Sequence, residues 1–149
     1  MTAQYLEDFA MGQMYRSGRL RVDKDQIITF AAQFDPQSYH LDEEAARRSV
    51  FGGLVASGWH TAAITMRLLV ETGLPLAGGI IGAGAEVSWP MPTRAGDVLQ
   101  VESEVQDIMP SRSRLDRGVA TIRSLTRNQR DEVVQVLVAK LIVPRRVLQ

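Results

Sequence analysis

Apolar residues in the first half of the chain recur three or four positions apart, which is typical of helices. Asp23 is suited to cap a helix that runs to about Phe34. Asp35-Pro36 ends this helix, because the residue before a proline is pushed away from helical geometry. The pattern then predicts a second short helix after Asp42, and an irregular connection between the two helices.

The most apolar segment predicts a third helix, from Gly58 to about Thr72, with Ser57 as its cap. Apolar residues cover most of its circumference, which is typical of a buried helix. Its polar residues His60, Arg67 and Glu71 are seven and four positions apart, so they share one stripe. We therefore expect His60 to be partly exposed or to lie at a subunit interface.

Strand patterns dominate the rest of the chain. We expect strands over residues 14–22, 80–89, 98–107, 118–127 and 133–143, with a hairpin loop at 128–131. The last strand is apolar on both faces, which favours a central position in the sheet. No linker divides the chain. The sequence therefore predicts one α+β domain over residues 1–149, an antiparallel sheet wrapped around a central apolar helix, which is the hot-dog architecture.

Composition narrows the function classes. The 149 residues are 45% hydrophobic, and 17 basic residues balance 17 acidic ones, which argues against a nucleic-acid partner. Cysteine is absent, which excludes disulfides and thiolate chemistry, and with two histidines we expect no metal site. The glycine-rich segment 78–84 lacks the spacing of a nucleotide-binding loop. Small residues at that position predict close packing of another element.

The N-terminus lacks the basic start and apolar run of a signal peptide. The longest apolar stretch is interrupted by charged residues and is too short to cross a bilayer comfortably. We expect a soluble, cytoplasmic protein that does not associate with membranes.

Asp35 and His40 are the strongest candidates for chemistry. They lie five residues apart on the expected connection between helices, and such connections often carry functional groups. A carboxylate and an imidazole that meet at one water provide the base and the acid that hydration of an activated double bond requires. The structural alternative is that Asp35 only ends a helix and His40 is a surface residue.

The start of the apolar helix is the second candidate. Exposed amide groups at a helix N-terminus attract negative charge, and a thioester oxygen that becomes enolate-like would be stabilised there. Gly58 would let a substrate approach its backbone N–H. The alternative is that Gly58 only permits close packing and Ser57 is only a cap. Trp59 fits the core better than the wall of an acyl pocket.

Taken together, these segments resemble the MaoC-like hydratases, whose best-known members are (R)-specific enoyl-CoA hydratases. The resemblance covers nearly the whole chain. It is carried by the segments Tyr5-Leu6-Glu7-Asp8-Phe9, Asp35-x4-His40-x-Asp42, Phe51-Gly52-Gly53-Leu54-Val55-Ala56-Ser57-Gly58 and Trp89-x-x-Pro92. Family members commonly have Asn-Pro where this chain has Gln37-Ser38, and many carry histidine at the position of Ser57.

The resemblance implies a hot-dog fold, at least a homodimer, and sites near the subunit interface. Asp35 and His40 match the acid and the histidine that activate water for addition to a trans-2-enoyl-CoA. Gly58 matches the glycine whose N–H faces the thioester oxygen, with Ser57 and Trp59 beside it. No cofactor is implied, because coenzyme A is part of the substrate. Gln37 could still donate a hydrogen bond with a longer reach than asparagine.

Two alternatives stay open. A hot-dog thioesterase would place a carboxylate on the central helix near the substrate, and the only acid on this helix is Glu71, near its far end. A non-catalytic subunit that binds acyl thioesters is the alternative from a different class. Gln37-Ser38 favours it, whereas the presence of both Asp35 and His40 argues against it.

Overall fold

Five antiparallel strands form one sheet in the computed structural model, which describes residues 2–146. The strands follow the order β1-β3-β4-β5-β2, so that β2 is an edge strand and β5 has neighbours on both sides. Their bounds are β1 (Met14–Arg21), β2 (Gly82–Ser88), β3 (Val98–Pro110), β4 (Arg117–Arg127) and β5 (Val133–Pro144). All five predicted strands are confirmed, and β5 is an interior strand as expected.

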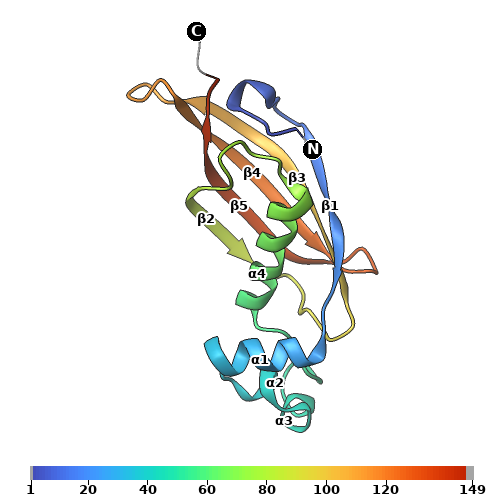
Figure 1. The fold of residues 1–149 in the computed structure, drawn as a ribbon. Helices are drawn as coiled ribbons and strands as arrows, with labels where there is room; N and C mark the ends of the chain where they lie inside the picture. Colours follow the sequence, from blue (N-terminus) through green and yellow to red (C-terminus); the bar gives the residue numbers. More distant parts are fainter. Residues whose placement is uncertain (1, 147–149) are drawn as a thin grey trace.

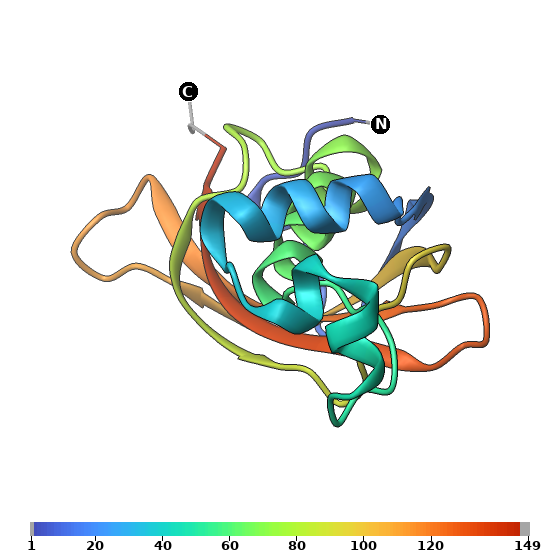
Figure 2. The ribbon, with the colours of Figure 1, turned by 90° about the horizontal axis from the view of Figure 1, so that it is seen from below.

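The helices lie on one side of this sheet (Figure 1). They are η1 (Leu6–Asp8), α1 (Lys24–Phe34), α2 (Ser38–Leu41), α3 (Glu43–Arg47), α4 (Gly58–Leu68) and η2 (Leu69–Gly73), a π-helical turn that extends α4. Figure 1 shows α1, α2 and α3 grouped at the N-terminal end of α4, and Figure 2 shows the sheet curving around the helices. The hot-dog α+β architecture predicted from the sequence is confirmed.

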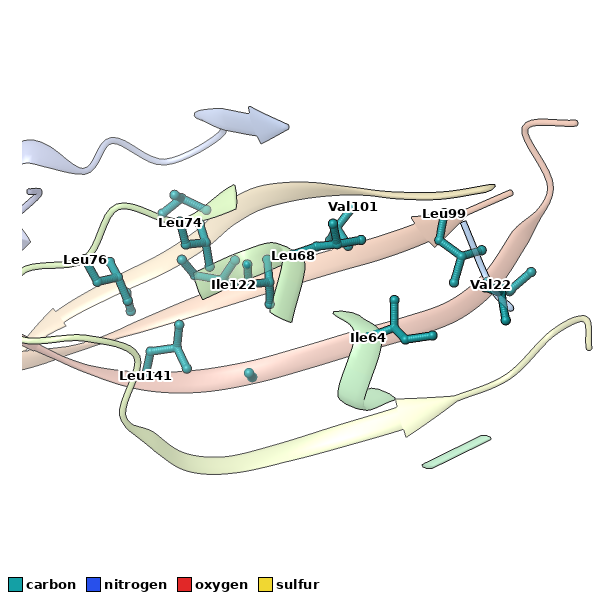
Figure 3. Close-up of a cluster of buried hydrophobic side chains, with 14 of the residues drawn as sticks. Val22, Ile64, Leu68, Leu74, Leu76, Leu99, Val101, Ile122 and Leu141 are labelled. Carbon is teal, nitrogen blue, oxygen red and sulfur yellow. The ribbon is translucent and has the colours of Figure 1, made fainter. Parts of the chain in front are cut away.

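The core fills the space between α4 and the sheet (Figure 3). Ile64 and Leu68 of α4 and Leu99, Ile122 and Leu141 of the strands belong to one buried cluster. Burial of each such side chain contributes roughly 1.5–3 kcal/mol to folding. This apolar packing fixes α4 against the sheet, and with it the position of the helix N-terminus.

The chain between the first two predicted helices differs from expectation. α1 spans the predicted residues, although the Asp23 side chain makes no capping hydrogen bond. α3 begins after Asp42 as predicted, and the Asp42 carboxylate caps it by accepting a hydrogen bond from the Glu44 N–H at 2.9 Å. Between them lies α2, one helical turn that carries His40, where an irregular connection was expected. Pro36 stops α1, but nothing prevents a new turn from forming beyond it.

Exposure along α4 also differs from expectation. The side of α4 that faces the sheet is buried, but Trp59 and Met66 of α4 and Val70 of η2 are exposed. The prediction that the whole surface of the helix is buried is therefore wrong for these three residues. His60 is buried rather than partly exposed, because α1 crosses the first turns of α4 and the Phe30 ring stacks on the imidazole at 4.6 Å. Arg67 lies farther along the helix, exposed, and pairs with Glu71 at 2.8 Å.

The glycine-rich segment before β2 does not pack closely against another element. Gly78, Gly79, Gly82 and Gly84 each have open space where a side chain would be, and the first two have positive φ. The prediction of close packing is therefore wrong. These glycines form a turn and an exposed strand edge instead.

Candidate active site

A cleft of about 400 Å³ opens where α2, the N-terminus of α4 and the segment after β2 meet. Asp35, His40, Gly58 and Trp59, four of the five residues selected from the sequence, line it. The fifth, Ser57, is fully buried beside them. A larger cleft of about 500 Å³ lies over β1, β3 and β4, but it contains none of the predicted site residues.

Asp35 lies at the C-terminal end of α1, where its backbone N–H donates to the Ala31 carbonyl at 2.8 Å. Pro36 then redirects the chain, so the carboxylate points to the following turn rather than along the helix. Its Oδ2 lies 3.3 Å from Nε2 of His40. The structure therefore brings the two candidate side chains together at the cleft.

His40 is buried and held from its other ring nitrogen. Nδ1 lies 2.7 Å from the backbone carbonyl of Val55. Because a carbonyl oxygen only accepts, this contact assigns the hydrogen to Nδ1 and leaves Nε2 as the proton-accepting atom in the neutral ring. The free Nε2 therefore faces both the cleft and Asp35.

The carboxylate of Asp35 is stabilised in its charged form. Partial burial alone would raise the pKa of Asp35, but hydrogen bonds from the side chains of Gln37 and Ser57, together with the attraction of a protonated His40, outweigh it and lower the pKa. Nε2 of Gln37 donates to Oδ1 of Asp35 at 2.6 Å, and the Tyr39 hydroxyl donates to the side-chain Oε1 of Gln37. Gln37 thus makes the hydrogen bond that the sequence suggested it could make.

The N-terminus of α4 forms another wall of the cleft. The Ser57 side chain caps the helix by accepting a hydrogen bond from the Trp59 N–H at 3.2 Å. Within residues 2–146 no acceptor pairs with the backbone N–H of Gly58. A Cβ at this position would lie 2.7–2.9 Å from three ring atoms of Trp89. The observed reason for a glycine is therefore close packing against Trp89, the second of the two explanations considered.

Two tryptophans meet at this end of the cleft. Trp59 is 60% exposed, so the prediction that it belongs to the core is wrong. Its ring meets the Trp89 ring edge-on at 5.2 Å between centroids. Trp89 was expected only at the end of a strand and in the Trp89-x-x-Pro92 segment. Its place in the site had no local signal, because the sequence does not show which loops converge on a helix terminus.

Thr61 and Thr93 also line the cleft, although no sequence motif marks them. Both are buried, and the Thr61 hydroxyl donates to Oγ1 of Thr93 at 3.0 Å. His60, the neighbour of Thr61, faces away from the cleft into the contact between α1 and α4.

No group of metal-binding side chains occurs in the part of the chain that the structure describes. Nor does any helix within residues 2–146 have the length and apolar character needed to span a membrane.

The sheet and the central helix define a hot-dog protein, with an acid–imidazole pair beside the N-terminus of that helix. Residues 8–128 match the family model described as MaoC like domain, and the chain belongs to this family.

The chain is also similar to three individual proteins. A solved structure described as the MaoC-like dehydratase from Rhodospirillum rubrum is 62% identical with a TM-score of 0.96, and the match covers 98% of this chain and 100% of that one. The uncharacterized protein YdeM of Bacillus subtilis is 39% identical over 85% of this chain and 89% of its own. A 3-hydroxybutyryl-CoA dehydratase of Methylorubrum extorquens is 30% identical over 74% of this chain and 69% of its own.

Proposed function

We propose that this protein is a hydro-lyase that adds water reversibly to the double bond of a trans-2-enoyl-CoA. The observation that carries the proposal is the 3.3 Å approach of Asp35 Oδ2 to His40 Nε2 at the wall of a cleft. Membership of the family and the similarity to a 3-hydroxybutyryl-CoA dehydratase support the same reaction class. Coenzyme A enters as part of the substrate, and the chemistry needs no separate cofactor.

Two neighbouring acceptor atoms suit a water molecule. A water donates two hydrogen bonds, and Asp35 Oδ2 and His40 Nε2 are placed to accept one each. The pair takes one proton from the water as its oxygen adds to C3 of the enoyl group. The same proton is then returned to C2, so that one water is added across the bond. An aspartate is ordinarily charged at neutral pH, and the lowered pKa of Asp35 extends this charged state to more acidic pH.

The developing negative charge falls on the thioester oxygen. The Gly58 N–H at the first turn of α4 is the candidate donor for this oxygen, helped by the dipole of the helix. Trp89 covers the Cβ side of Gly58, so the substrate would reach the N–H along the opposite side of the backbone. Ser57 would hold both the helix terminus and the Asp35 carboxylate in place.

The decisive assay is the loss of enoyl absorbance when purified protein is mixed with crotonyl-CoA. We expect Asp35→Asn and His40→Gln each to lower kcat by roughly a hundredfold or more with the fold intact, as expected when a general acid–base group is lost. Asp42→Asn is the matched control: it removes a carboxylate from the same segment, outside the cleft, and asparagine still caps α3. Near-normal turnover in either site variant would contradict the proposal.

The structure favours hydration over thioester hydrolysis. α4 itself contains no acidic residue, and Glu71 in the turn beyond it is exposed and paired with Arg67 rather than directed to the cleft. Release of free thiol from acyl-CoA would nevertheless indicate a thioesterase. Binding of acyl-CoA without turnover would indicate the non-catalytic subunit.

We further propose that the working form is a homodimer joined through the edge of β2. This strand has a partner on one side only, and nearly all of its residues are exposed. Trp59 and Met66 of α4 and Val70 of η2 form an exposed apolar stripe, at spacings of seven and four. A second copy of the chain would pair with the edge of β2 and cover this stripe, which explains why the central helix is apolar nearly all round.

A further inference from the structure

Trp89 separates the cleft from the protein core. Its ring lines the cleft, whereas its Nε1 donates at 2.9 Å to Oε1 of Gln135, which is completely buried on β5. On its cleft side the ring lies over the backbone of Gly58 and contacts Trp59. The indole is therefore held from both sides and cannot turn without loss of these contacts.

A chain of polar groups continues behind the indole. Nε2 of Gln135 donates to the Thr65 hydroxyl at 3.1 Å, and the Thr65 and Thr126 hydroxyls lie 2.7 Å apart. None of these three side chains is exposed to solvent. The buried side of α4 thus carries the polar groups Thr61 and Thr65 beside the apolar Ile64 in its first turns, and only apolar side chains at Leu68 and Leu69 beyond them.

This arrangement opposes the entry of a long hydrocarbon tail. A tail that extended past Trp89 along α4 would have to displace the indole and separate Gln135 from its partners. Each buried polar group left without a partner costs about 1–3 kcal/mol, whereas each added methylene contributes only about 0.8 kcal/mol when it is buried. The exchange is unfavourable for a tail only a few methylenes longer than crotonyl, because entry would leave several groups of the Trp89–Gln135–Thr65 network without partners at once.

We infer that Trp89, anchored by Gln135 and its polar network, limits the acyl group and makes short-chain enoyl thioesters the preferred substrates. The inference rests on the proposed hydratase function and deepens it by naming the substrate class. Trp89 is the specificity-determining residue, and Gln135 is a positioning residue that acts through it. The anchor lies on β5, far along the chain from the residues expected to carry the chemistry.

The test compares kcat/KM for crotonyl-CoA, trans-2-hexenoyl-CoA and trans-2-octenoyl-CoA. In the wild-type protein we expect octenoyl-CoA to be poorer than crotonyl-CoA by roughly a hundredfold, the scale on which a pocket rejects added methylenes. Trp89→Ala should raise the ratio of octenoyl to crotonyl activity by roughly tenfold or more. Trp89→Phe, which loses the N–H and part of the ring, should give a smaller rise. Met91→Ala, at the rim of the same cleft, should affect all three substrates alike.

The outcomes separate the two proposals. Equal wild-type activity on all three substrates, or an unchanged ratio in both Trp89 variants, would overturn the chain-length inference and leave the hydratase proposal standing. If the wild-type protein hydrates none of them, the proposed function fails, and calorimetric binding of butyryl-CoA against octanoyl-CoA then tests the same selectivity. A preference for butyryl-CoA that Trp89→Phe relaxes would support the inference, and equal affinities would end it.

Discussion

At the scale of single residues, the acid of the candidate pair depends on its neighbours. The Gln37 amide donates to the Asp35 carboxylate and is held in turn by Tyr39. Burial raises the pKa of Asp35, and the hydrogen bonds together with His40 lower it by more. Gln37 and Ser57, which take no part in the proposed proton transfer, therefore help to keep the carboxylate charged.

Replacement of Gln37 by leucine should move the acidic limb of the pH–rate profile. Loss of the amide donor removes a contact that favours the carboxylate, so the pKa of Asp35 rises and activity begins to fall at a higher pH. The measurement is kcat/KM for crotonyl-CoA against pH. Ser38→Ala, at the adjacent exposed position, should not change the pH at which kcat/KM begins to fall. An unchanged limb in Gln37→Leu would show that Asp35 is not the group that titrates.

Gly58→Ala should destabilise the protein through contact with Trp89. The added Cβ would meet three ring atoms that cannot move freely, and overpacking of this kind costs about 1–3 kcal/mol. In a Trp89→Ala background the same substitution should cost little, since the clash is gone. Denaturant unfolding of the two single variants and the double variant gives the coupling. If the losses in free energy of unfolding are additive, the Trp89 ring does not restrict the residue at position 58.

At the scale of elements, the contact between α1 and α4 buries a histidine without a full set of partners. Within residues 2–146, Nδ1 of His60 has no hydrogen-bond partner, and Phe30 covers one face of the ring. Asp25 and Arg67 line the shallow groove beside it. Burial lowers the pKa of His60 below its ordinary value of 6.5, so the folded state favours the neutral ring.

This burial predicts a pH-dependent stability. Below about pH 6.5 the unfolded chain binds a proton at His60 more readily than the folded protein does, so the free energy of unfolding falls as the pH is lowered. His60→Phe should remove this part of the dependence, while His40→Gln, the only other histidine variant possible, should retain it. Urea titrations between pH 5 and 8 measure the difference. Parallel pH curves for wild type and His60→Phe would contradict the assignment.

The elements themselves were largely predictable, because each depends on local pattern. The alternation in β3, the cap at Asp42 and the proline after Asp35 all act within a few residues. What the pattern missed depends on which element covers which. His60 and Arg67 lie on the same face of α4, but α1 crosses the helix at His60 and buries it, whereas Arg67 stays exposed.

In the candidate site, too, the residues that are close in sequence were predictable, and those brought in by the packing of distant elements were not. Asp35 and His40 lie close in sequence, so their convergence could be predicted from one segment. Trp89, Thr93 and Gln135 reach the same region from the far half of the chain. Their contribution follows from the packing of β2 and β5 against α4, which no local pattern encodes.

At the scale of the whole molecule, β2 leaves the sheet open on one side. We expect a solution mass of twice 16.5 kDa, and we expect Ala85→Lys on the exposed edge to shift the protein toward monomer, because charged lysines oppose pairing of edge strands. Leu115→Lys, in the exposed turn between β3 and β4, is the control and should remain dimeric. Light scattering after gel filtration gives the masses. A monomeric wild-type protein would rule out the interface.

The segment after β2 also supports the backbone that orients His40. The Ala56 N–H donates to the Thr93 carbonyl at 2.8 Å, and Arg94 donates to the Phe51 carbonyl at 2.7 Å. Val55, between them, carries the carbonyl that holds the imidazole. If a second subunit holds β2 in place, the same contacts would also hold the His40 ring in its orientation. Specific activity should then fall on dilution in parallel with the fraction of dimer, and it should recover when the protein is concentrated again. The concentration of the protein would in this way regulate its activity.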